Sequence, residues 1–454
     1  MTDAQDPERD RLSARLGRVA HVGAQIGGAA AAYGSARLFG GDDAAIAKAV
    51  KDALGRSKGP LMKVAQLLAT IPDLLPAAYA EEFRKLQSHA PAMGWPFVAR
   101  RMRAELGVDW RTKFYEFERE AAHAASFGQV HRAVADDGRA LACKLQYPDM
   151  ASAVEADLGQ LRTLLALFKR MDNTIDSTEA IEEVSARLRE ELDYDREVKH
   201  MRLFARVLAD LPARVPVPLT PLCTKRLITM TWLSGEGLLA HKEADQETRN
   251  RIAALLFSVW WRPMMRYGII HGDPHLGNYS FTDDAGALNL IDFGCVRIFP
   301  PRFVAGVVNL QRALKADDME GVAAAYEGWG FKNLNNDLIE ALTIWARFIY
   351  GPIIDDRVRT VADGVAPNEY GRRDLGEVRR RIRALGPVLI PREFVFMDRA
   401  ALGLGAAFLH LRAELNFTRL FEDSIADFDI DALAARQREA LWDVGLGAAS
   451  CESS

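Results

Sequence analysis

Three oxygen-bearing side chains stand close together in the second half of this 454-residue chain. Asp273 and Asn278 are five residues apart, and Asp292 follows Asn278 by 14 residues, at the start of a DFG tripeptide. Carboxylate and amide oxygens suit Mg²⁺, which keeps phosphates and waters as its other ligands. A turn signal at 283–286 separates the two segments, so a hairpin there would return the chain to the same place. The sequence therefore predicts that Asn278 and Asp292 bind Mg²⁺ beside Asp273.

The segment 271–278 and the DFG tripeptide together indicate phosphoryl transfer. An Asp followed five residues later by an Asn is the arrangement of the kinase catalytic loop, where the Asp meets the acceptor and the Asn binds a metal ion. Asx, Gly and Pro are also ordinary turn residues, but the whole set at this spacing is far rarer than a DFG tripeptide alone. We interpret Asp273 as the residue that orients the attacking water or acceptor hydroxyl.

Lys144 is the second anchor of the predicted site. It follows Leu141, Ala142 and Cys143 in a run whose alternate residues fall on opposite faces of a strand. A lysine at such a position holds the α- and β-phosphates in kinases. Ala142 shares its face and is small enough to leave room for an adenine.

A helical pattern over 177–208 carries the carboxylates that such a lysine needs as partners: Glu190, Glu191, Asp193 and Glu197. At 100° per residue, Asp193 and Glu197 share one helix face, and Glu191 lies about 120° round from Glu197. We expect one helix to present carboxylates to two different neighbours.

The segment before the Lys144 strand differs from the glycine-rich phosphate loop of protein kinases. Residues 121–131 read AAHAASFGQVH, with alanines where a GxGxxG motif is expected. Alanines stiffen a backbone that glycines would leave mobile. This segment argues against a typical protein kinase, although the catalytic residues match one.

Five motifs in one order resemble the UbiB/ADCK (AarF-type) family of atypical kinase-like proteins, over roughly residues 45 to 300. They are KVAQ at 63–66, SFGQVH at 126–131, KLQYP at 144–148, ELD at 191–193 with Glu197, and HGDPHLGN with DFG. Three residues depart from the family pattern: Ala65 in place of glycine, His123 within the alanine run, and Leu276 in place of proline.

The resemblance implies ATP and Mg²⁺ binding, with ATPase or small-molecule or lipid kinase activity in support of ubiquinone biosynthesis at membranes. In the family, the K-x-G-Q segment lies over the active site, is held by the E-x-D carboxylates and blocks protein substrates. Carried over to this chain, Lys63 and Gln66 meet Glu191 and Asp193. The resemblance also implies a quinone-precursor or lipid ligand and a peripheral membrane contact.

The residues assigned to the nucleotide lie in the alanine-rich loop, the Lys144 strand and the segment that joins the two lobes. They are Ala125, Ser126, Gln129, Val130, Ala142, Lys144, Met230 and Trp232. Lys144 is assigned Glu197 as its partner, and Asp273, Lys144 and Glu197 form the catalytic set.

The elements that must position these residues indicate a bilobal α+β body, which the resemblance makes protein-kinase-like. Strands are predicted at 128–134, 139–146 and 227–232. A helix is predicted over 246–267 with Gly268 as its C-cap, and helices follow from 301 to 442. The domains assigned are an N-terminal helical extension (1–114), an N-lobe (115–232) and a helix-rich C-lobe with extra C-terminal helices (233–454).

Composition excludes several classes of protein. The chain has 58 Lys and Arg against 62 Asp and Glu, a net charge of −4, so it has no global basic field for nucleic acid. Four widely spaced cysteines form no CxxC motif and fit reduced thiols of the cytosol. The charged N-terminus lacks the apolar region of a secretory signal. We expect a cytoplasmic protein whose membrane contact comes from a local patch in the N-terminal helices.

Two alternatives stay open. A small-molecule phosphotransferase of the aminoglycoside or choline kinase type also uses an HGDxxxxN loop, although the K-x-x-Q and QVH segments argue against it. A nucleotide-gated scaffold would bind ATP to switch partner or lipid contacts, with little turnover. Rapid phosphorylation of a soluble alcohol favours the first, and biological function without Asp273 favours the second.

Overall fold

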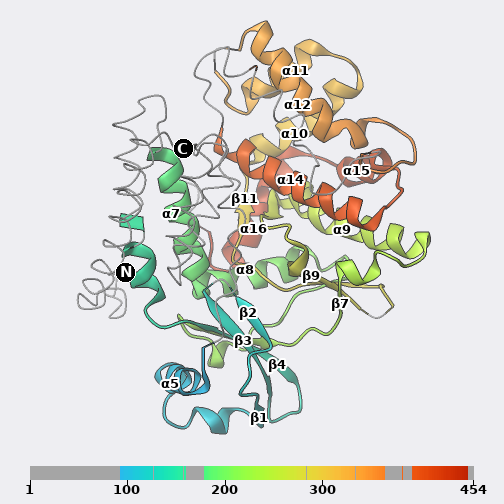
Figure 1. Ribbon diagram of the computed structural model, residues 1–454. Helices are drawn as coiled ribbons and strands as arrows, with labels where there is room; N and C mark the ends of the chain where they lie inside the picture. Colours follow the sequence, from blue (N-terminus) through green and yellow to red (C-terminus); the bar gives the residue numbers. More distant parts are fainter. Residues whose placement is uncertain are drawn as a thin grey trace, which may run out of the picture. The chain divides into compact units, whose positions relative to one another are not determined.

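The computed structural model describes residues 93–447, except 126, 157, 160–177, 283, 333, 363–380 and 382–390. The described chain forms two compact units. The first contains residues up to Glu197 together with Pro218–Trp232, and the second contains Val198–Val217 and residues from Leu233 onward. Figure 1 labels most of the helices and several of the strands of both units. Of the predicted N-terminal helical extension (1–114), residues 1–92, with Lys63 and Gln66, lie outside the described residues.

The first unit is built on a sheet of five short strands, all paired antiparallel. Their order is β1-β3-β4-β6, and β2 also pairs with β3. The strands are β1 (Glu116–Phe117), β2 (His123–Ala125), β3 (Gly128–Val134), β4 (Ala140–Gln146) and β6 (Leu227–Thr231). Gly138, at φ 82°, closes the turn between β3 and β4 by donating to the Ala135 carbonyl. The strands predicted from the sequence are confirmed.

One face of this sheet forms the core of the first unit. Leu141, Cys143 and Leu145 of β4 are fully buried. They pack with α5 (Trp95–Leu106) and with Trp110, and Figure 1 shows α5 against the sheet. Because side chains alternate along a strand, the residues between them, including Lys144, must lie on the other face.

The predicted helix over 177–208 is wrong in one respect, because it is two helices. α7 (Thr178–Leu192) and α8 (Tyr194–Val207) are separated at Asp193. Oδ1 of Asp193 accepts a hydrogen bond of 2.9 Å from the Arg196 amide. An Asp side chain that bonds the backbone three residues on satisfies a free amide of the next helix, so it favours a helix start.

The second unit packs around α9 (Gln246–Tyr267), which contacts β8 and the helices near the C-terminus. Aromatic rings fill this contact: the ring centroids of Phe257 and Phe417 are 6.0 Å apart, and those of Trp261 and Phe421 are 4.9 Å apart. The predicted bounds of α9 are confirmed.

Gly268 ends α9 as predicted. It adopts the left-handed conformation, with φ 65°, and its amide donates to the Met264 carbonyl at 2.8 Å. A Cβ at this position would lie 2.8 Å from the Phe299 carbonyl oxygen and 2.6 Å from Nε2 of Gln437. Glycine is therefore required by backbone conformation and by space.

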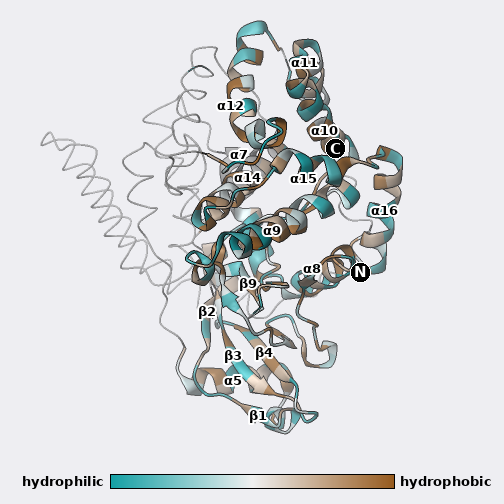
Figure 2. Ribbon diagram, turned by 90° about the vertical axis from the view of Figure 1, so that its right-hand side faces the viewer, coloured by the Kyte–Doolittle hydropathy of each residue, from teal (hydrophilic) through white to brown (hydrophobic). Residues whose placement is uncertain are grey.

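The other helices of the second unit lie in the span where helices were predicted. They are α10 (Pro301–Lys315), α11 (Met319–Gly328), α12 (Asn336–Ile354), α14 (Arg392–Leu411), α15 (Phe417–Ile425) and α16 (Ile430–Asp443). Figure 2 shows hydrophobic and hydrophilic bands on α11 and α12, as expected for helices with one buried stripe. Within the described part of the chain, no helix is both long enough and apolar enough to cross a membrane.

Candidate active site

Lys144 lies in β4, on the face opposite the apolar core of the first unit. Its Nζ is 2.6 Å from Oε1 of Glu197, in the first turn of α8. Only 12% of the Lys144 side chain and 3% of the Glu197 side chain are exposed, so each charge neutralises the other away from bulk water. The same Nζ lies 5.5 Å from the ring centroid of Tyr194. The structure thus brings together the two side chains that were assigned to each other.

The remaining carboxylates of this segment do not share the position of Glu197. The predicted common face of Asp193 and Glu197 is wrong, because the helix is interrupted at Asp193 and the side chain there caps α8. Asp193 is exposed, and Glu191 is half-buried at the end of α7. Glu190 lies 3.5 Å from the Arg196 guanidinium. The contacts assigned to Lys63 and Gln66 fall outside the described residues and stay a prediction.

A small apolar surface surrounds Lys144 on its face of the sheet. Residues directly opposite each other in antiparallel strands point the same way. Val130 pairs with Lys144, and Met230 pairs with Ala142. Ala142 and Met230 are buried, and Val130 is half-buried. Four of the residues assigned to the nucleotide are therefore on one face.

Trp232 follows β6 and contacts two side chains of the same unit. Its ring is stacked on His123 of β2, with centroids 5.8 Å apart and an interplanar angle of 15°. The Arg132 guanidinium carbon lies 4.1 Å from the Trp232 ring centroid. His123, one of the departures from the family pattern, therefore stacks on a residue that was assigned to the nucleotide. Ala125 ends β2, and the adjacent Ser126 is outside the described residues.

The assignment of Gln129 to the nucleotide is corrected by its position. Gln129 pairs with Leu145 on the core face of the sheet and is fully buried. Its Oε1 accepts from the Met93 amide at 2.6 Å, and its Nε2 contacts Nε2 of His131 at 2.7 Å. His131 Nδ1 is 2.9 Å from the Glu118 carbonyl oxygen. Gln129 and His131 of the QVH segment therefore bond the backbone of Met93 and Glu118, on the face of the sheet opposite Lys144.

The second unit carries the other predicted residues on two loops between strands. The four strands concerned are β8 (Ile269–His271), β9 (Tyr279–Phe281), β10 (Leu288–Leu290) and β11 (Val296–Ile298). β9 pairs with β10, and β8 pairs with β11. Both loops therefore run between the same two strand pairs, and the Ile291 amide donates to the Asn278 carbonyl at 3.2 Å. This places Asn278 and Asp292 side by side, as the hairpin prediction required.

Asp273 orients the amide of Asn278. Nδ2 of Asn278 donates to the carbonyl oxygen and to Oδ2 of Asp273, both at 3.1 Å. Both partner atoms can only accept hydrogen bonds, so the amide nitrogen of Asn278 must face them. The amide oxygen, Oδ1, then points away from Asp273 and can serve as a metal ligand. Oδ1 of Asp292 accepts from the Gly294 amide at 2.9 Å. An amide oxygen and a carboxylate fit Mg²⁺ that takes its other ligands from phosphates and water.

Two buried histidines hold the backbone of the DFG segment. Nε2 of His271 donates to the Asp292 carbonyl, and Nδ1 of His200, in α8, donates to the Phe293 carbonyl at 3.0 Å. Sequence reasoning assigned no role to either imidazole. Every residue has a backbone carbonyl, so the partner of such a bond cannot be recognised from its residue type. The sequence therefore could not predict these two contacts.

Helix α14 packs against the Asp273 loop at Pro274. Pro274 is buried, and a Cβ added at Gly403 of α14 would lie 2.3 Å from its Cγ. The absence of a side chain at Gly403 is what lets the proline and the helix approach. The loop is thus packed at Pro274 and hydrogen-bonded at Asn278.

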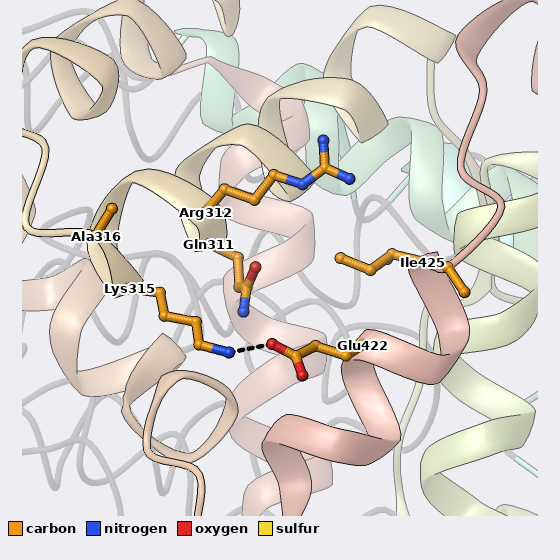
Figure 3. Close-up of a pocket in the computed structure, with 7 residues that line it drawn as sticks. Gln311, Arg312, Lys315, Ala316, Glu422 and Ile425 are labelled. Carbon is orange, nitrogen blue, oxygen red and sulfur yellow. Dashed lines mark hydrogen bonds and ion pairs between the residues drawn. The ribbon is translucent and has the colours of Figure 1, made fainter.

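A separate hollow of about 420 Å³ lies between α10 and α15. Figure 3 shows Lys315 and Glu422 joined by an ion pair beside it. Its lining residues are Gln311, Arg312, Lys315, Ala316, Glu422, Ile425 and Ala426. None of the residues predicted for the site is among them, so this hollow is not part of the candidate site.

Comparison with known proteins supports a kinase-like identity. A family model described as the ABC1 atypical kinase-like domain matches residues 85–326. The chain is 26% identical over 376 residues to the atypical kinase COQ8B, mitochondrial, of Rattus norvegicus, covering 81% of this chain and 69% of that protein. It is 28% identical over 330 residues to the atypical kinase COQ8, mitochondrial, of Saccharomyces cerevisiae, covering 69% of this chain and 65% of that protein.

A third relative is the AarF domain-containing protein kinase 1 of Xenopus tropicalis, 30% identical over 274 residues, with 59% of this chain and 52% of that protein covered. The chain thus spans between half and just over two thirds of these three relatives. Among solved structures, the complex of Rv3197 with erythromycin from Mycobacterium tuberculosis matches with a TM-score of 0.58 and 26% identity, covering 82% of this chain and 93% of that chain. This likeness confirms the predicted bilobal, α+β kinase-like fold class.

Proposed function

The chain belongs to the ABC1 atypical kinase-like family, and from that premise we propose that it is a Mg²⁺-dependent ATPase or a kinase of small molecules or lipids. Membership confirms the resemblance inferred from the five motifs. The observation that carries the proposal is the arrangement of Asp273, Asn278 and Asp292. The amide of Asn278 is turned by Asp273 so that its oxygen is presented, and the hairpin sets Asp292 beside it.

Each residue is proposed to contribute a separate part of phosphoryl transfer. Bound ATP supplies the phosphoryl group, and Mg²⁺ neutralises the charge that develops on it. Asn278 and Asp292 hold the ion. Lys144, kept in place by Glu197, contacts the α- and β-phosphates. Asp273 orients the attacking water or acceptor hydroxyl, and its own bond to the Asn278 amide fixes the carboxylate.

The proposed adenine surface is the apolar patch next to Lys144. Val130, Ala142 and Met230 share its face of the sheet. Small and flexible apolar side chains suit a flat ring, as ligand pockets are lined mainly by such groups. Trp232, stacked on His123, adds an aromatic face.

Regulation and substrate are part of the same proposal. Lys63 and Gln66 are proposed to meet Glu191 and Asp193 and to exclude protein substrates. The Asp193 carboxylate already accepts the Arg196 amide, so Lys63 would share that group with the helix cap. A quinone-precursor or lipid ligand and a peripheral membrane contact are proposed from the family. An ATPase assay with liposomes and quinone-like phenols tests them.

Loss of metal binding in an Asp292→Asn variant tests the function. Mg-ATP at about 100 times its Kd should stabilise the wild type by about 2.7 kcal/mol in a thermal shift experiment. We expect the variant to lose this shift, because the substitution removes the charge of the one carboxylate assigned to the ion, and Mg²⁺ is usually bound through one or two carboxylates. It should still fold, because the amide oxygen can accept the Gly294 amide. Asp423→Asn, on the exposed side of α15, is the matched control and should keep the shift. An unchanged shift in Asp292→Asn contradicts the assignment.

An Asp273→Asn variant separates turnover from binding. We expect it to keep the Mg-ATP thermal shift and to lose ATPase or kinase turnover, measured as inorganic phosphate or phosphorylated acceptor. Full turnover in this variant would remove Asp273 from the catalytic set. Biological function without turnover would favour the nucleotide-gated scaffold. Phosphorylation of a soluble alcohol would favour the aminoglycoside or choline kinase type.

A further inference from the structure

The DFG segment is held by one peptide group that makes two hydrogen bonds. The carbonyl of Phe293 and the amide of Gly294 belong to the same planar peptide unit. The carbonyl accepts from Nδ1 of His200 at 3.0 Å, and the amide donates to Oδ1 of Asp292 at 2.9 Å. His200 and the carboxylate of Asp292 are therefore joined through a single rigid group.

This peptide group would rotate easily without a restraint. Its rotation changes ψ of Phe293 and φ of Gly294, and glycine accepts values of φ that other residues resist. A rotation would turn the Gly294 amide away from Asp292 and release the carboxylate. The bond from His200 opposes it, because a rotated carbonyl would lose its donor.

Burial makes the His200 bond difficult to replace. His200 is 2% exposed and Phe293 is 0% exposed, so water does not reach the carbonyl as a substitute donor. Phe204, one turn after His200 on α8, packs on Phe293 with ring centroids 5.4 Å apart. The neighbouring carbonyl, that of Asp292, accepts from His271. Both carbonyls at the start of the DFG segment are thus fixed by imidazoles.

We propose that His200 is a positioning residue for the metal-binding carboxylate of Asp292, acting through the peptide group between Phe293 and Gly294. This inference rests on the proposed function, in which Asp292 binds Mg²⁺. His200 bonds a backbone carbonyl, so it acts on the carboxylate indirectly. It sets the direction of the Gly294 amide, and this amide sets the rotamer of the Asp292 side chain. Groups that orient a metal ligand typically change metal affinity by about 10- to 100-fold when removed.

Three substitutions test the position of the donor nitrogen. Nδ1 of histidine is attached to Cγ, as is the amide nitrogen of asparagine, whereas the amide nitrogen of glutamine is one atom further out. His200→Asn therefore keeps the donor in place, His200→Gln moves it, and His200→Leu removes it. The full-length variants are titrated with Mn²⁺ in the presence of a non-hydrolysable ATP analogue, and bound Mn²⁺ is measured by electron paramagnetic resonance.

We expect His200→Asn to bind Mn²⁺ within about threefold of the wild type, and His200→Gln and His200→Leu to bind it about tenfold or more weakly. Hydrogen exchange of the Gly294 amide should accelerate in the same two variants. Equal Mn²⁺ affinity in all three variants, or equal losses in the asparagine and glutamine variants, overturns the inference. If His200→Leu does not fold, the asparagine and glutamine pair still decides it. Failure of the wild type to bind Mn²⁺ would instead contradict the proposed function.

Discussion

The two sets of candidate residues are supported in different ways. In the first unit, Lys144 lies on a strand and Glu197 on a helix, and the two side chains form a buried ion pair. In the second unit, Asp273, Asn278 and Asp292 stand on loops, and backbone hydrogen bonds and two strand pairs hold them. The first set is held by an ion pair between two side chains. The second set is held largely by hydrogen bonds between side chains and backbone groups.

This difference predicts different costs of mutation. Removal of one member of a buried ion pair is costly, because the remaining buried charge loses its oppositely charged neighbour. The loop carboxylate of Asp292 is half-buried and bonded to an amide, and a neutral side chain can accept that bond. Substitutions of Lys144 or Glu197 should therefore reduce both function and stability. Substitution of Asp292 should reduce function with little loss of stability.

The largest effect is expected for Lys144→Met. The substitution removes the ion pair with Glu197, whose side chain is only 3% exposed, and should destabilise the first unit by about 3–5 kcal/mol. Hydrogen exchange of the β3 and β4 amides under native conditions measures this loss for the first unit alone. Asp292→Asn is the comparison variant and should change stability by about 1 kcal/mol or less.

A double variant checks the reason for that loss. Glu197→Gln on the Lys144→Met background removes the buried negative charge, so the double variant should lose less stability than the sum of the two single variants. Equal losses in Lys144→Met and Asp292→Asn, or strict additivity in the double variant, would show that the two regions are not supported differently.

The same comparison explains what the sequence could predict. The face of Lys144 follows from alternation along one strand, and the meeting of Asn278 with Asp292 follows from spacing around one turn; both are local properties. Gln129 was misplaced because its neighbour Val130 does face Lys144, and a motif does not say which of its residues point inward. His200 could not be predicted, because its partner is a backbone carbonyl 93 residues away.

The sequence carries a signal for the interruption at Asp193. The run from 177 to 208 reads as continuous helix, since its many Glu, Arg and Lys residues are good helix formers. However, Asp195 and Glu197 place acidic residues directly after Asp193, the pattern of a helix start. Asp193 is a helix cap, and an acidic first turn follows it.

The second expected effect is a pH dependence confined to the first unit. Burial lowers the pKa of His131, and this outweighs the opposite effect of the Glu118 and Glu120 backbone. Unfolded chains therefore bind a proton at His131 below pH about 6.5, whereas the folded unit resists it. The stabilisation is complete above that value and is lost as the pH falls below it, at up to about 1.4 kcal/mol per pH unit.

His131→Asn tests this assignment. Asparagine does not titrate and can still donate to the Glu118 carbonyl, although it loses the contact with Gln129. The variant should be less stable at neutral pH but should show a flatter stability profile between pH 5 and 6.5, measured by exchange of the β3 amides. An equally steep profile would mean that other groups cause the pH dependence. No matching change is expected in the loops of Asp273 and Asp292.

The smallest effect concerns Asp193, where a helix cap and a charge partner can be separated. Asparagine caps a helix about as well as aspartate, whereas alanine costs about 1 kcal/mol. If Asp193 serves α8, Asp193→Asn should resemble the wild type and Asp193→Ala should loosen the first turn, which carries Glu197. Faster exchange of the Glu197 amide in the alanine variant alone would show this. If Asp193 instead serves Lys63 through its charge, both variants should change ATPase activity equally, because both remove the charge. The activity would then depend on the charge of Asp193 and not on its hydrogen bond to the first turn of α8.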